Sequence, residues 1–101
     1  KIFLIQGIDR KIALDELAES KGLEYSELLD ELESIVETGT KINIGYFLDD
    51  ILDEDQQEEI MDFFRQSEED DIEEAIQELG EDYTEEEIRL VRVKFLSEMG
   101  N

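Results

Sequence analysis

Carboxylates dominate the side chains of this sequence that could do chemistry. The 101-residue chain has 31 Asp and Glu residues against 9 Lys and Arg, a formal net charge of −22, and no His or Cys. The missing His and Cys exclude an imidazole general base, a Ser-His-Asp triad, a thiol nucleophile and a zinc site with thiolate or imidazole ligands. Paired carboxylates such as Asp49 and Asp50 remain available for acid–base work, although a chain this acidic also contains such pairs by chance.

The densest acidic run lies within residues 68–74. It consists of Glu68, Glu69, Asp70, Asp71, Glu73 and Glu74. Such a run could bind a basic protein partner or a divalent cation, although the chain has no EF-hand spacing. Acidic residues at a helix N-terminus also stabilise the helix through its dipole. We therefore predict a solvent-exposed helix start here, with an acidic interaction patch as the functional alternative and no metal site.

Four basic residues in the first half of the chain are candidates for contact with nucleic acid: Arg10, Lys11, Lys21 and Lys41. The alternative role, which we favour, is to balance nearby surface carboxylates such as Asp9 and Asp15. Binding to DNA phosphates requires Lys and Arg side chains that displace counterions. The net charge therefore excludes this chain, taken alone, as a non-specific phosphate binder.

Helical periodicity runs along the whole chain. Apolar spacing and capping residues predict helices within residues 1–8, 13–20, 26–38, 46–52, 55–66, 67–79 and 84–99. For residues 1–8 a strand remains possible, because four adjacent apolar residues do not decide between a helix and a strand. We expect an all-α fold with at most one short extended segment, near 40–45. The chain forms one domain, 1–101, with a helix-turn-helix, winged-helix-like half at 1–45 and an acidic helical bundle at 46–101. No apolar run is long enough to span a membrane, and we expect the chain to be a piece of a longer protein.

Residues 14–38 have the pattern of a helix-turn-helix. Ala18 is small where the two helices would cross, Gly22 suits a left-handed turn, and Leu28 would pack the second helix. Ser26 is the predicted N-cap of that second helix. The helix has five carboxylates and no Lys or Arg, whereas a recognition helix reaches base edges with Arg, Lys, Asn or Gln. We therefore expect this helix pair to be a packing unit, and the charge of its second helix favours contact with protein over contact with DNA.

Two further features complete the residue-level predictions. Ser67 with Asp70, and Thr84 with Glu87, have the spacing of capping boxes. Arg89 lies four residues after Glu85, so that pairing along one helix face accounts for it without a ligand.

Five blocks of the sequence together form a recognisable pattern: Gln6–Lys11 (QGIDRK), Leu14–Leu23 (LDELAESKGL), Glu37–Ile44 (ETGTKINI), Tyr46–Phe47, and Tyr83–Arg92 (YTEEEIRLVR). This pattern resembles the C-terminal helix-turn-helix domain of bacterial RecQ-family DNA helicases. The resemblance covers most of the chain, and the last block is the most specific.

The resemblance implies a parent ATP-dependent 3′–5′ DNA helicase that acts in recombination and repair in the bacterial cytoplasm. Such a parent uses ATP and Mg²⁺ and holds a structural zinc. This chain has no phosphate-binding G-x-x-x-x-G-K-[ST] loop, so we expect no cofactor and no catalytic residue in it.

Three roles remain open for the chain itself. The first is a non-catalytic accessory domain whose partner is the rest of the helicase chain or a basic protein, with DNA contacted through the parent. The second is a weak, direct DNA-binding helix-turn-helix. The third is an acidic module that mimics DNA.

Overall fold

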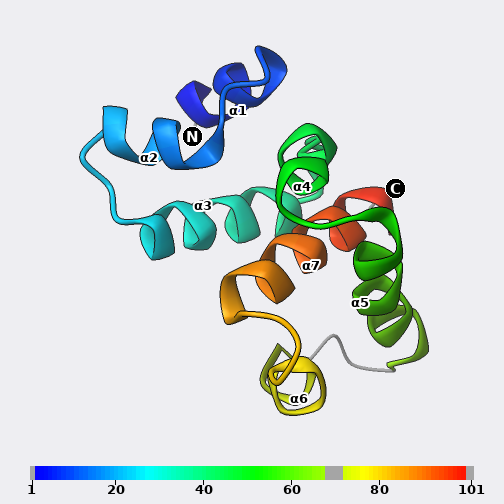
Figure 1. Ribbon diagram of the computed structural model, residues 1–101. Coiled ribbons are helices and arrows are strands. Elements are labelled where there is room, and N and C mark those ends of the chain that lie inside the picture. The colour runs from blue at the N-terminus through cyan, green and yellow to red at the C-terminus, as the bar shows by residue number, and fades with distance from the viewer. Residues whose placement is uncertain (1, 68–71, 100–101) are drawn as a thin grey trace.

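The computed structural model describes residues 2–67 and 72–99, and in these residues it contains helices and turns but no strand (Figure 1). The helices are α1 (Ile2–Asp9), α2 (Leu14–Ser20), α3 (Tyr25–Glu37), α4 (Gly45–Ile51), α5 (Glu54–Gln66), α6 (Ile72–Leu79) and α7 (Glu85–Met99). The predicted all-α fold is confirmed. Within the described part of the chain, no helix is long and apolar enough to cross a membrane.

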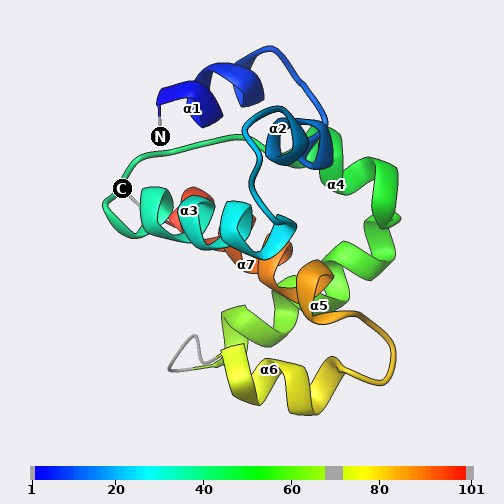
Figure 2. The same ribbon diagram turned by 90° about the vertical axis from the view of Figure 1, so that its left-hand side faces the viewer.

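Helix α7 is the centre of the fold. It packs against α3, α4, α5 and α6, while α1 and α2 lie at one end of the molecule and α6 at the other (Figures 1 and 2). Its buried residues Ile88, Leu90, Val91 and Val93 point to several sides, because a helix surrounded by others must be apolar around most of its girth. One cluster of buried side chains extends from Leu4 to Val93, so both halves of the chain share a core.

Helices α1, α2 and α3 end in the same local motif. In each, a residue with a positive φ follows the helix: Lys11 at 59°, Gly22 at 67° and Gly39 at 93°. After α2, for example, the amide of Gly22 donates to Glu19 O (3.1 Å) and the amide of Leu23 donates to Ala18 O (2.9 Å). This is the Schellman pattern, which satisfies the last carbonyls of a helix. The predicted left-handed turn at Gly22 is confirmed.

The starts of α3 and α7 show one wrong and one correct prediction. Ser26 is not the N-cap of α3, because the helix already includes Tyr25 and Glu24 takes the cap position; the Glu24 amide donates to Glu27 Oε1 (2.8 Å). The side chain that bonds to the backbone at this helix start is thus the Glu27 carboxylate and not the expected Ser26 hydroxyl. The Thr84–Glu87 capping box is confirmed, because the Thr84 amide donates to Glu87 Oε1 (2.8 Å) and the Glu87 amide to Thr84 Oγ1 (3.1 Å). The Ser67–Asp70 box involves residues outside the described part of the chain.

Residues 40–44 connect α3 to α4 without forming a helix or a strand. Their backbone is held by Ser97 of α7, whose hydroxyl accepts a hydrogen bond from the Ile42 amide (2.9 Å) and donates one to the Ile42 carbonyl (2.7 Å). Ser97 is buried, so these bonds replace solvent for both backbone groups. The loop is thereby fixed to the central helix.

Candidate functional site

The helix-turn-helix is built from α2, the turn at residues 21–24, and α3, with α1 packed across α2. Ala18 and Leu28 are buried, as the sequence predicted. Helix α1 also packs tightly on α2 at Gly7, where an added Cβ would stand 2.4 Å from Leu17 Cδ2. Sequence reasoning missed this contact, and the available signal was a glycine inside an otherwise apolar helical run.

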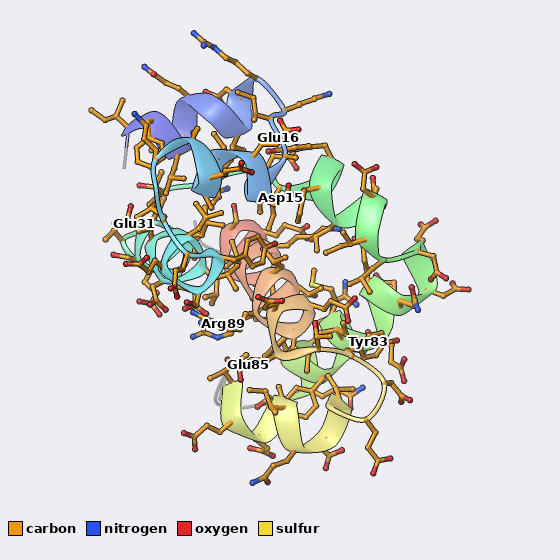
Figure 3. The ribbon with its side chains drawn as sticks, turned by 60° about the vertical axis from the view of Figure 1, so that its left-hand side comes forward. Asp15, Glu16, Glu31, Tyr83, Glu85 and Arg89 are labelled. Carbon is orange, nitrogen blue, oxygen red and sulfur yellow. The ribbon has the colours of Figure 1, made fainter. Side chains whose placement is uncertain are left out.

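Carboxylates of α3 that border α7 are joined to it by Arg89. Arg89 Nη2 donates to Glu33 Oε1 (2.7 Å) and to Asp30 Oδ1 (2.6 Å), and its Nε donates to Glu33 Oε2 (3.2 Å). Figure 3 shows Arg89 in the space between the two helices. The Arg89 and Glu33 side chains are only 13% and 17% exposed, so this pair is largely removed from solvent. Hydrogen bonding to Glu33 raises the pKa of Arg89 above its ordinary value, and Asp30 adds to the effect.

Arg92 extends the same contact by one helical turn. Its guanidinium lies 3.7 Å from Glu33 Oε2 and 3.7 Å from Glu37 Oε2. The sequence predicted that Arg89 would pair along its own helix, but Glu85 is its most distant partner, at 4.0 Å. The prediction found only the weakest contact because sequence spacing reports neighbours on one helix and not the facing helix.

These ion pairs explain much of the acidity of the helix that would read DNA. Three of its five carboxylates, on Asp30, Glu33 and Glu37, face arginines of α7. The remaining two are on Glu27, which caps the helix start, and Glu31 (Figure 3). No side chain of α3 is basic, so the helix offers phosphates no counter-charge.

The four basic candidates lie just beyond helix C-termini and are all exposed. Arg10 and Lys11 follow α1, Lys21 follows α2, and Lys41 lies four residues after α3. Cations at this end of a helix are favoured by its dipole. Lys21 Nζ lies 4.9 Å from the centroid of the Phe3 ring. Within the described residues, none of the four forms an ion pair.

The acidic candidates are described only in part. Glu73 and Glu74 are exposed in the first turn of α6, and Glu68, Glu69, Asp70 and Asp71 lie outside the described residues. Asp49 accepts a hydrogen bond from Gln57 Nε2 (3.0 Å). Across residues 2–67 and 72–99, no group of three Asp, Glu, His or Cys side chains is arranged to hold a metal ion.

A cavity of about 480 Å³ lies where α2, α3, α4 and α7 meet. Tyr25, Phe47, Ile51 and Leu90 provide its apolar surface, and carboxylates of α2 and α7 stand at its edge. Burial raises the pKa of Tyr25 to about 12, and the charges of Glu86 and Asp15 contribute in the same direction. The walls of this cavity come from four separate helices, so residue spacing along the chain does not predict it.

The comparisons with known proteins bear on the first half of the chain. No curated protein matches the chain. Residues 1–48 match the family model described as "RecQ-1-like, helix-turn-helix domain". That stretch contains α1, α2, α3 and the start of α4, which are the elements that build the helix-turn-helix described above. Residues 1–48 are therefore similar to the RecQ-1-like helix-turn-helix domain.

Proposed function

We propose that this chain is a non-catalytic accessory domain of a RecQ-like ATP-dependent DNA helicase, and that it acts by contacting protein. The parent would work in DNA recombination and repair in the bacterial cytoplasm. The family match to residues 1–48 supports the parentage. The partner would be the remainder of the helicase chain or another basic protein.

The observation that carries this proposal is the way α3 is used. In a DNA-binding helix-turn-helix the second helix is free to enter the major groove and has side chains that reach base edges. Here Arg89 and Arg92 pair with the polar side of that helix, and it has no basic residue. The same architecture is therefore better suited to protein contact than to base reading.

The residues of this chain do not fit the cofactors that the parent family uses. The sequence has no phosphate-binding loop for ATP and no Cys or His for a structural zinc. ATP, Mg²⁺ and zinc would therefore be held by other parts of the parent protein, and this chain would take part in no chemical step.

The proposal is tested by two measurements on matched proteins. Deleting residues 1–101 from the parent helicase should change unwinding or partner binding while leaving the ATP hydrolysis of the motor intact. In the second measurement, the isolated chain is titrated with fluorescent duplex and single-stranded DNA at ~20 mM salt, where every phosphate contact is strongest. We expect no binding. A deletion that changes neither unwinding nor partner binding would refute the accessory role.

One observation favours direct, weak DNA binding as a second candidate. Arg10 and Lys11 are adjacent, exposed and, within the described residues, not paired with carboxylates. Saturable binding at low salt that disappears in Arg10→Ala/Lys11→Ala would support this function. If the chain instead competes with DNA for a basic protein, the DNA-mimicking role is favoured.

A further inference from the structure

The cavity between α2, α3, α4 and α7 has the composition of a recognition site. Its volume of about 480 Å³ is that of a small ligand pocket. Leu90 and Phe47 are buried beneath it, whereas Ile51 is 38% exposed and Tyr25 is half-buried. The exposed parts of Ile51 and Tyr25 give an incoming side chain an apolar and an aromatic surface to cover.

The edge of the cavity is acidic. Asp15 and Glu86 line it from the first turns of α2 and α7, and none of the lining residues is basic. In the described part of the chain neither carboxylate takes part in a hydrogen bond or an ion pair. Asp15 faces the space framed by α2, α4 and α7 in Figure 3. Burial is the main cause of the raised pKa of Tyr25, and the charges of Glu86 and Asp15 raise it further.

We propose that this cavity binds an arginine or lysine side chain from a protein segment with apolar neighbours. An aromatic ring with carboxylates around it favours a cation on a hydrophobic stem, because the stem covers the apolar surface while the charge meets the ring face and the acids. Arginine fits best, since its planar guanidinium stacks on aromatic rings and pairs with carboxylates. The inference deepens the proposed function by placing the contact on the chain and stating the chemistry of the partner.

The experiment uses two peptides and amide NMR of the isotope-labelled 101-residue chain at ~20 mM salt. The first peptide is acetyl-Ser-Leu-Arg-Phe-Arg-Ser-amide, and the second replaces both arginines by uncharged citrulline. We expect the arginine peptide to shift the amides of Tyr25, Ile51 and Glu86, and the citrulline peptide to bind more weakly. Equal binding of the two peptides, or shifts spread over other helices, would overturn the proposal.

A matched pair of variants distinguishes attraction by the two carboxylates at the cavity edge from attraction by the overall negative charge of the chain. Asp15→Asn/Glu86→Gln removes the two carboxylates at the cavity edge. Glu16→Gln/Glu85→Gln removes the same charge from the first turns of the same two helices, at positions that do not line the cavity. We expect the first variant to weaken peptide binding about three- to tenfold and the second to change it less than twofold. Equal effects of the two variants would refute the site.

Two further outcomes keep this inference distinct from the proposed function. Tighter binding of spermine than of the arginine peptide at the same amides would show a small-polyamine site and overturn the assignment to a protein segment. If neither peptide binds while deletion of the domain still alters the parent helicase, the cavity assignment is wrong and the accessory function stands.

Discussion

Removal of Arg89 is the sharpest test of the contact between α3 and α7. In Arg89→Ala the guanidinium that donates three hydrogen bonds to Glu33 and Asp30 is lost. Glu33, whose side chain is 17% exposed, then retains Arg92, at 3.7 Å, as its only cationic partner among residues 2–67 and 72–99. The variant therefore leaves a half-paired carboxylate between two helices of a chain with an already large negative charge.

The size of the effect follows from the bonds that are lost. A hydrogen bond to a charged group contributes about 1.5–3 kcal/mol, and an exposed ion pair contributes at most about 1 kcal/mol. Because Glu33 is mostly buried and Asp30 is 73% exposed, nearly all of the loss comes from the two bonds to Glu33. We expect Arg89→Ala to lower the free energy of unfolding by about 2–3 kcal/mol, which corresponds to a fall in Tm of roughly 10–20 °C in a chain of this size.

The assay is urea unfolding followed by far-UV circular dichroism, with Arg65→Ala as the control. Arg65 also pairs with two carboxylates, Glu58 at 3.0 Å and Asp62 at 2.7 Å, but all three lie on the exposed face of α5 and its side chain is 46% exposed. Both variants change the net charge by the same amount. The control should therefore be clearly less destabilised, since exposed pairs are screened by solvent.

A double-mutant cycle completes this test. If Arg89 acts mainly through Glu33, adding Glu33→Ala to Arg89→Ala should cost little more than the arginine substitution alone. Equal destabilisation by Arg89→Ala and Arg65→Ala, or simple additivity in the cycle, would refute the reasoning that α3 is held to α7 by this pair.

The remaining predictions concern local geometry and pH, and each is checked by the same urea unfolding. Lys11 has a φ of 59°, so Lys11→Gly should stabilise the chain by about 1 kcal/mol. Gly22 has a φ of 67° with open space around an added Cβ, so Gly22→Ala should destabilise the chain by a similar amount. Changes of the same sign in the two variants would contradict this reasoning. Ser97→Ala leaves the amide and carbonyl of Ile42 without their partner and should cost about 2 kcal/mol, whereas an effect below about 0.5 kcal/mol would mean that water replaces the hydroxyl. The pKa of Tyr25 is raised from 10 to about 12, so the unfolded chain loses this proton first and stability should fall as the pH rises through that interval. Tyr25→Phe should reduce this fall, and an unchanged pH dependence would contradict the raised pKa.

The sequence contains enough information to predict the helices of this fold. Apolar residues at spacings of three and four fixed the type of each element, and local signals marked several of the ends, such as Gly22 after α2 and Thr84 with Glu87 before α7. These signals act within one turn of a helix, so a single sequence shows them directly.

The features that sequence reasoning missed are those that depend on the facing helix. Arg89 has acidic neighbours on its own helix and on α3, and only the packing of α7 against α3 determines which of them is closest. Lys11 adopts a left-handed backbone conformation that glycine usually occupies. The Schellman hydrogen bonds after α1 hold its backbone in that conformation. The cavity beside Tyr25 needs the placement of four helices before its walls can be identified.

The net charge of −22 does not distinguish carboxylates that pair with arginines from carboxylates that do not, whereas the packing does. Glu33 and its neighbours Asp30 and Glu37 face Arg89 and Arg92, so these carboxylates form ion pairs within the molecule. Asp15 and Glu86 have no such partner in the described residues, and they stand at the edge of an apolar cavity. Burying an unpaired carboxylate is costly, whereas an exposed carboxylate beside an apolar surface can meet a partner's cation at little cost. The proposed contact with protein therefore rests on Asp15 and Glu86 beside the apolar cavity, and not on the total charge.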